Sequence, residues 1–135
     1  MQIGKVVFSQ SAPIIIETDN SLTFKQLRRN NVERCEQVFH KLNYWSLSDW
    51  TTALCGKLGE AANIIKKIRR LDSADKDKDS PKHREELFNK LKLELANVQI
   101  YLDLLAAAAG IDLGKATIEK FNKVSKKRGS DILLG

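Results

Sequence analysis

The 135-residue sequence lacks the features that mark membrane, secreted and disulfide-bonded proteins. No apolar run approaches the roughly 18–20 residues that span a bilayer, and the longest, residues 104–110, is alanine-rich and too short. Lys5 and the Val6-Val7-Phe8 run do not make a signal-peptide pattern. Cys35 and Cys55 are the only cysteines, and both fall in helical patterns, so we expect reduced, buried thiols. These features predict a cytoplasmic protein with no membrane partner.

Acidic residues are scarce relative to basic ones, 17 against 23, which gives a net charge of +6. Basic residues cluster over residues 66–70 and 123–128. Such a charge fits a nucleic-acid partner, a phosphorylated small molecule or ordinary solubility. Aromatic residues are not interleaved with the basic ones, which argues against a platform for stacking single strands. We interpret each basic run as a solvated face and expect no nucleic-acid partner.

The spacing of apolar residues predicts an all-α domain over residues 23–135. Repeats of three and four predict helices over residues 23–42, about 46–71, about 82–109 and 112–127. Thr23 or Ser21 is expected to cap the first helix and Ser46 or Ser48 the second, and Gly110 is expected to end the third. The polar stretch 72–81 reads as a loop. Some apolar stripes are wider than one monomer covers, which favours self-association.

Residues 1–22 differ from the rest of the chain. Two short apolar runs, Val6-Val7-Phe8 and Ile14-Ile15-Ile16, flank Pro13 and suggest short extended pieces. We therefore expect a short irregular or extended N-terminal arm ahead of the helical domain.

Two polar pairs interrupt the apolar pattern of the second and third helices. Lys57 and Glu60 are three residues apart, as are Glu94 and Asn97, so each pair shares one helix face. Antiparallel packing across the 72–81 loop places both pairs at a similar depth. Two facing glutamates are a minimal magnesium site. The alternatives are exposed surface residues, or a buried polar layer in which Lys57 pairs with the glutamates.

Both segments resemble the signatures of the MazG-like nucleotide pyrophosphohydrolases. The first likeness lies in Gly56-Lys57-Leu58-Gly59-Glu60-Ala61-Ala62-Asn63-Ile64-Ile65-Lys66-Lys67. The second lies in Leu93-Glu94-Leu95-Ala96-Asn97-Val98-Gln99-Ile100-Tyr101-Leu102. The stretches 110–113 and 120–125 continue it, and Trp45 and Trp50 ahead of the first motif also fit. The likeness covers residues 25–133, most closely the compact phage and bacterial type, and implies a four-helix MazG-like bundle.

This resemblance implies a Mg²⁺-dependent enzyme, a homodimer or homotetramer, that hydrolyses nucleoside triphosphates or deoxynucleoside triphosphates to monophosphate and pyrophosphate. The family carries four acidic metal ligands. Glu60 and Glu94 match two of them, whereas Lys57 and Asn97 stand at the other two. The four positions sum to −1 here instead of −4. At 4 Å and a dielectric of about 20, each unit charge is worth roughly 4 kcal/mol. Metal affinity and hydrolysis should therefore be weak or lost.

The expected site then contains two catalytic and metal-binding carboxylates, Glu60 and Glu94, and a weakened ligand, Asn97. Candidate substrate-binding residues are Lys57, Tyr101, Lys120, Asn122 and Trp50. Two other functions remain open. One is a catalytically inactive nucleotide-binding homologue in which Lys57 anchors the phosphates. The other is a helical protein-interaction module in which Lys57 and the glutamates form a buried polar layer.

Overall fold

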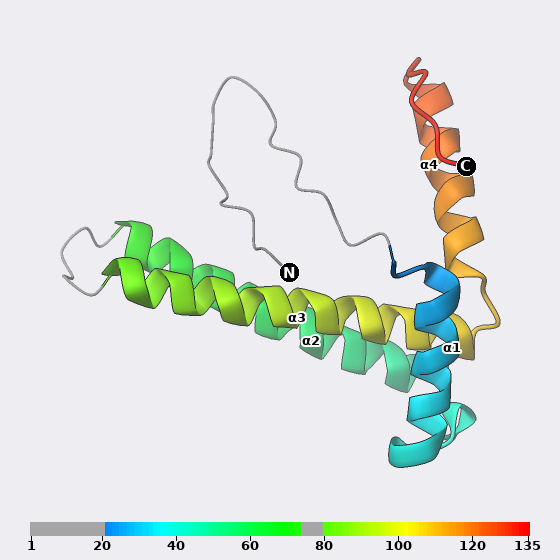
Figure 1. Cartoon of the computed structure of the whole chain (residues 1–135), viewed down its shortest axis with the longest axis horizontal. Helices are drawn as coiled ribbons and strands as arrows, with labels where there is room; N and C mark the ends of the chain where they lie inside the picture. Colours follow the sequence, from blue (N-terminus) through cyan, green and yellow to red (C-terminus); the bar gives the residue numbers. More distant parts are fainter. Residues whose placement is uncertain (1–20, 74–79) are drawn as a thin grey trace.

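The structure, a computed structural model, describes residues 21–73 and 80–135 of the chain. Most of these residues form four helices, with no strand in either range: α1 (Phe24–Arg34), α2 (Leu47–Ser73), α3 (Ser80–Ala108) and α4 (Leu113–Lys127). A π-helical turn (Cys35–Phe39) and a 3-10 turn (Leu42–Tyr44) lie between α1 and α2. The prediction of an all-α chain with four helices is confirmed (Figure 1). The predicted arm, except for its last two residues, lies outside the described residues.

Local capping chemistry sets several helix ends where the sequence predicts them. Thr23 Oγ1 accepts the backbone N–H three residues on at 3.0 Å. Ser46 and Asp49 form a reciprocal pair, in which Ser46 Oγ accepts the Asp49 N–H and Asp49 Oδ2 accepts the Ser46 N–H. Gly110 has φ 69, the left-handed conformation that ends α3, and the Asp112 side chain caps α4. Such ends depend on neighbours in the sequence, which is why they are predictable.

Two helix boundaries differ from the prediction. The first helix was expected to run through residue 42, but the α-helix ends at Arg34 and a π-turn follows, closed by the His40 N–H donating to Cys35 O. The second and third helices each extend two residues into the predicted 72–81 loop. An ion pair of 2.9 Å between Arg84 Nε and Asp72 Oδ1 joins these two helix ends.

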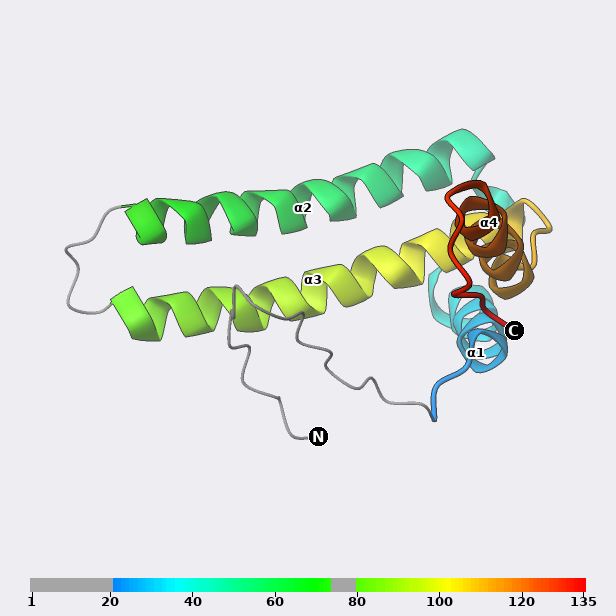
Figure 2. The same cartoon turned by 90° about the horizontal axis from the view of Figure 1, so that it is seen from above.

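The two long helices, α2 and α3, lie antiparallel and side by side along a continuous seam (Figure 2). Their buried and half-buried residues recur at alternating steps of three and four, as in a coiled coil. On α2 the seam positions are Trp50, Leu54, Lys57, Ala61, Ile64, Ile68 and Leu71. On α3 they are Arg84, Leu87, Leu91, Glu94, Val98, Tyr101 and Leu105. Lys57 and Glu94 therefore occupy positions that an uninterrupted seam would fill with apolar side chains.

The helix α1 crosses the C-terminal part of α3 (Figure 1). A buried polar network fixes it there. Asp103 is 1% exposed, and its carboxylate accepts from Arg28 Nε at 2.9 Å and from Asn31 Nδ2 at 3.0 Å. Asn31 also donates to the backbone carbonyl of Ile100. Buried charges are tolerated only when paired in this way. The adjacent apolar core is formed by Cys35, Trp50 and Leu104.

The last helix, α4, turns away from α3 by 102° and stands off the helical hairpin (Figure 1). Phe24 of α1 packs near Gly114 at its start, and the Asn122 side chain binds both the N–H and the C=O of Leu134 in the extended tail. Of the helices described, none has by itself the length and apolarity to cross a membrane, although α3 and α4 meet that test jointly as a bent pair.

Candidate functional site

The structure brings Lys57, Glu60 and Glu94 together where α2 and α3 meet. Lys57 Nζ lies 3.8 Å from Glu60 Oε2, one turn along α2, and the Lys57 side chain is 27% exposed against 54% for Glu60. Glu94 faces them from α3. Its Oε2 atom is buried and has no hydrogen-bond partner among the described residues. An unpartnered carboxylate oxygen is costly in a seam, so this atom marks the cluster as a place for a proton or a cation.

The environment of Glu94 disfavours its charged form. Burial raises the pKa of this carboxyl above its ordinary value, and the nearby Glu60 carboxyl raises the pKa further. Lys57 acts in the opposite direction but does not cancel the shift. The carboxyls of Glu60 and Glu94 therefore lie close together, and the positive charge of Lys57 only partly offsets the repulsion between them.

An aromatic wall connects this cluster to a cavity. Lys57 Nζ lies 5.3 Å from the centre of the Tyr101 ring, a cation–π distance. Tyr101 in turn meets Trp50 edge to face, with ring centres 6.4 Å apart. Three predicted substrate-binding residues, Lys57, Tyr101 and Trp50, therefore lie in one continuous row.

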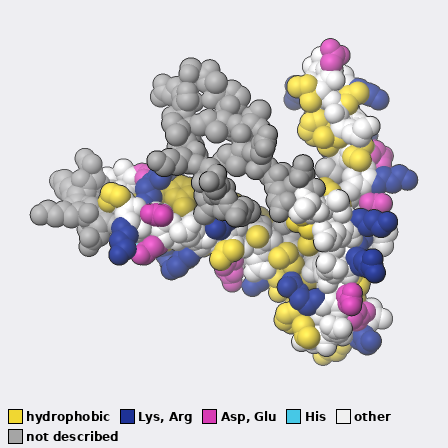
Figure 3. All heavy atoms as spheres, in the orientation of Figure 1, with side chains coloured by type: hydrophobic (Ala, Val, Ile, Leu, Met, Phe, Trp, Pro, Cys, Tyr) yellow, Lys and Arg dark blue, Asp and Glu magenta, His cyan; other side chains and the backbone are white. Residues whose placement is uncertain are grey.

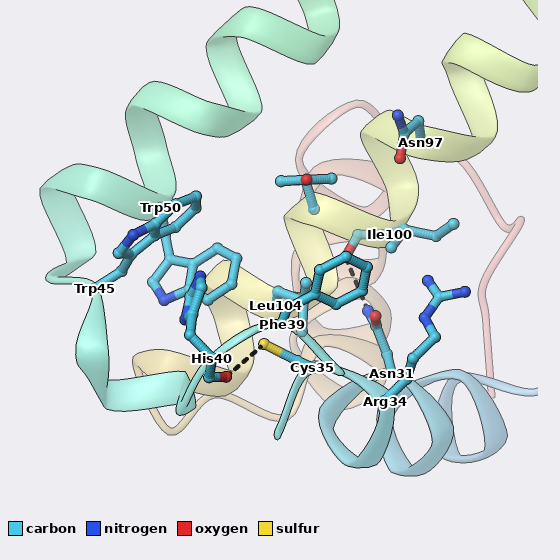
Figure 4. Close-up of a pocket in the computed structure, with 11 residues that line it drawn as sticks. Asn31, Arg34, Cys35, Phe39, His40, Trp45, Trp50, Asn97, Ile100 and Leu104 are labelled. Carbon is cyan, nitrogen blue, oxygen red and sulfur yellow. Dashed lines mark hydrogen bonds between the residues drawn. The ribbon is translucent and has the colours of Figure 1, made fainter. Parts of the chain in front are cut away.

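Beyond this wall lies a cavity of about 270 Å³ between the π-turn and the α2–α3 hairpin (Figure 4). The rings of His40, Trp45 and Trp50 crowd one side, with ring centres 4.5 Å apart for His40–Trp45 and 4.7 Å for Trp45–Trp50. Trp50 is held in place because its Nε1 donates to the Leu42 carbonyl at 3.0 Å. A flat, apolar ligand group fits such a cavity.

Polar groups reach the same cavity from α1 and α3. Asn97, expected as a weakened metal ligand, lines it and lies one turn from Glu94. Arg34 and Asn31 also line it, but Asn31 is already bonded to Asp103 and Ile100. Arg34 and His40 were not anticipated from the sequence. His40 comes after the unpredicted π-turn, which orients it, so the helical spacing gave no signal for it.

Two predicted substrate-binding residues lie elsewhere. Lys120 is exposed on α4, and the Asn122 amide is engaged with the backbone of Leu134. Because α4 points away from the hairpin, this chain does not bring either residue to the Glu60–Glu94 pair (Figure 1). The expectation that Cys55 is buried is wrong, since it is exposed, whereas Cys35 is buried as expected. Both thiols are free.

The oxygen donors of this cluster fit a magnesium ion, but they would bind it only weakly. Two carboxylates and one amide oxygen, from Glu60, Glu94 and Asn97, are oxygen donors of the kind that Mg²⁺ takes. The unpartnered Glu94 oxygen favours a cation, and the Lys57 ammonium opposes one. Within residues 21–73 and 80–135, no group of three or more His, Cys, Asp or Glu side chains is placed to hold a metal.

Comparison with known proteins gives no match for this chain among family models, curated proteins or solved structures. The likeness to the MazG-like family therefore rests on the two sequence motifs and their spacing.

Proposed function

We propose that this chain is a nucleotide-binding protein of the MazG-like pyrophosphohydrolase type, in which cleavage of nucleoside triphosphates to monophosphate and pyrophosphate is weak or lost. The observation that supports this is the Glu60–Glu94 pair, with its buried unpartnered oxygen, set beside an aromatic cavity. Two neighbouring carboxylates repel unless a proton or cation lies between them. A cation that accompanies a polyphosphate would meet that need.

Each residue has a distinct role in this proposal. Glu60 and Glu94 would hold Mg²⁺, and Asn97 would add a neutral oxygen. Bound there, the ion would supply neutralisation of phosphate charge and activation of a water molecule. Lys57 contributes a point charge to the phosphates but weakens the metal. The rings of Trp45 and His40 provide apolar faces on which a nucleobase stacks, and Trp50, which is 2% exposed, supports them from the core.

A second candidate, nucleotide binding without magnesium, is favoured by the position of Lys57. Its ammonium already lies 3.8 Å from Glu60 and beside the Tyr101 ring, so it neutralises part of the charge that a metal would neutralise. In this case Lys57 anchors the phosphates directly, and catalysis is absent because an ammonium does not activate water as a metal does.

Pyrophosphate release from a panel of ribo- and deoxyribonucleoside triphosphates with Mg²⁺ tests the proposal. The wild-type chain is compared with Lys57→Glu/Asn97→Asp, which restores the acidic positions. The matched control is Lys66→Glu/Asn89→Asp, which changes the net charge equally at exposed positions of α2 and α3. We expect strong pyrophosphate release only from Lys57→Glu/Asn97→Asp. Equal release from the wild type would contradict the charge argument.

Nucleotide binding separates the remaining outcomes. The change in melting temperature on adding nucleotide is measured in Mg²⁺ and in EDTA. The proteins compared are the wild type, Glu60→Gln/Glu94→Gln and Lys57→Met. Stabilisation that survives EDTA and is lost in Lys57→Met favours magnesium-free binding. If no variant hydrolyses any nucleotide and none is stabilised by one, the nucleotide proposal fails and a helical interaction module becomes the better explanation.

A further inference from the structure

The side-chain amide of Asn31 is fixed in one orientation by α3. Its Nδ2 donates to the Ile100 carbonyl at 2.9 Å and to Asp103 Oδ2 at 3.0 Å. An amide nitrogen has two N–H groups, and both are used here. The opposite orientation would place Oδ1 against a carbonyl and a carboxylate, which are both acceptors, so Nδ2 must face α3. The Oδ1 atom is therefore the group that Asn31 can offer to a ligand.

This Oδ1 atom is an unused hydrogen-bond acceptor on the cavity wall. It accepts no hydrogen bond from any residue in the described ranges. Asn31 is 5% exposed, yet within residues 21–73 and 80–135 the only buried side-chain polar atom without a partner is Glu94 Oε2, so Asn31 Oδ1 is accessible. Because Asn31 lines the cavity, this oxygen opens onto the space proposed for the base. A fixed acceptor without a partner favours a ligand that brings an N–H group.

Arg34 supplies a hydrogen-bond donor on the same side of the cavity. It lies one turn after Asn31 on α1, so both side chains share one helix face. Figure 4 shows the two side chains next to each other, below Ile100. A guanidinium has donors only and stays charged. The α1 wall of the cavity therefore offers an acceptor that cannot donate and a donor that cannot accept.

This pair of groups matches the edges of some nucleobases and not of others. In cytosine and adenine an amino group, which donates, lies next to a ring nitrogen that accepts. In uracil, thymine, guanine and hypoxanthine a carbonyl oxygen, which accepts, lies next to a ring N–H, which donates. Facing Asn31 and Arg34, the second kind of edge sets acceptor against acceptor and donor against donor.

The position of α1 along α3 determines which edge of a base the pair meets. Asn31 binds α3 at Ile100 and Asp103, six and nine residues beyond Glu94, which is about 9–14 Å along the helix axis. A nucleotide with its phosphates at the Glu60–Glu94 pair extends over such a distance. Its base then lies at α1 with the edge opposite the sugar foremost, and that edge carries the amino or carbonyl group.

We infer that Asn31 and Arg34 select amino bases, so that this chain binds cytosine and adenine nucleotides in preference to those of uracil, thymine and guanine. Asn31 Oδ1 accepts from the amino group, and Arg34 donates to the neighbouring ring nitrogen. Asp103 is a positioning residue, because it holds the Asn31 amide in place. The inference rests on the proposed nucleotide-binding function and adds a class of base to it.

Matched nucleotides separate base recognition from the attraction of charge. Lys and Arg side chains gather along the outer edge of α1 and α4, and the net charge of +6 attracts any polyphosphate (Figure 3). This attraction is the same for two nucleotides that differ only in the edge of the base. Cytosine and uracil form one such pair and adenine and hypoxanthine another, because in each pair only the amino edge is replaced by a carbonyl edge.

Isothermal titration calorimetry of the full chain in Mg²⁺ measures the dissociation constants of the α,β-imido forms of dCTP, dUTP, dATP and dITP, which resist cleavage between these phosphates. We expect dCTP to bind at least ~10-fold more tightly than dUTP, and dATP than dITP, because each mismatch leaves two polar groups without partners. The 2-pyrimidinone analogue of dCTP lacks only the amino group. It should also bind at least ~10-fold more weakly than dCTP, which tests Asn31 without changing the fold.

Arg34→Gln should lower both ratios at least ~3-fold, because a glutamine amide can turn to donate or accept. Arg34 is exposed, so its replacement does not disturb the core. The matched control is Arg29→Gln, which removes the same charge from an exposed position of α1 outside the cavity and should keep both ratios.

The outcomes separate this inference from the proposed function. Equal affinities within each pair, or tighter binding of dUTP and dITP, would overturn the selection of amino bases while leaving nucleotide binding in place. If Arg34→Gln weakens all four nucleotides by the same factor, Arg34 contacts the phosphates and the reading of the base by this pair is refuted. No measurable binding of any of the four would overturn both the inference and the proposed function.

Discussion

Replacing Lys57 by glutamate reverses the charge beside Glu60 and should raise the affinity for a divalent cation. Two unit charges 4 Å apart interact by roughly 1 kcal/mol in water. Lys57 Nζ and Glu60 Oε2 are 3.8 Å apart with both side chains partly exposed, so the value for water is the appropriate lower limit. The substitution changes the side-chain charge by two units, and the ion carries a charge of two. Multiplying both by roughly 1 kcal/mol makes the binding free energy of the ion more favourable by about 4 kcal/mol. The dissociation constant should fall about 1,000-fold.

The measurement is titration of the full chain with Mn²⁺ as a probe, following the free ion by electron paramagnetic resonance in 0.1 M salt. Lys66→Glu makes the same charge change on an exposed part of α2 and should alter the affinity less than ~3-fold, because screening weakens distant charges. An increase below tenfold for Lys57→Glu, or an equal increase for Lys66→Glu, would refute the argument that this lysine is what weakens the metal site.

Three further substitutions probe the rest of the site and its support. Asp103→Ala leaves Arg28 and Asn31 without their buried acceptor and should cost about 3 kcal/mol, which for 135 residues lowers Tm by about 10 °C in calorimetry. Glu94→Gln should raise Tm at pH 7, because the raised pKa makes ionisation of Glu94 unfavourable in the folded state. Its advantage should vanish as the pH falls to the ordinary pKa of 4.5, where the wild type is protonated. Trp50→Ala should cost about 3–5 kcal/mol in urea denaturation and abolish any nucleotide-induced thermal shift.

Local rules predicted the helices well because their signals lie within one turn of the chain. Thr23, Ser46 and Asp112 cap their helices through neighbours in the sequence, and Gly110 supplies the conformation that ends α3. The π-turn was missed because Val38 and Phe39 continue the helical spacing, yet both side chains are exposed. The spacing of apolar residues predicts which helix face they share, but it does not predict which of them pack against another helix.

The candidate site was predictable in part for the same reason. The positions of Lys57, Glu60 and Glu94 follow from two helical motifs and one antiparallel turn, so their meeting could be foreseen. The cavity could not, because it depends on His40 after the π-turn and on the crossing of α1 over α3. Asp103 did offer a signal, since a lone acid within an otherwise apolar run usually has a buried partner.

The charged layer in the α2–α3 seam also determines how the two helices are aligned. Sliding α3 by one heptad, about 10 Å, would still match apolar side chains along the seam. It would, however, move Glu94 away from Lys57 and Glu60 and set the polar side chains of Lys57 and Glu94 against apolar residues of the seam, which is unfavourable. Filling both positions with leucine would strengthen the seam and also permit alternative alignments. Lys57 and Glu94, which are proposed to bind the phosphates and the metal, thus also select one alignment of the hairpin. A chain optimised only for stability would lose the binding site and the single alignment together.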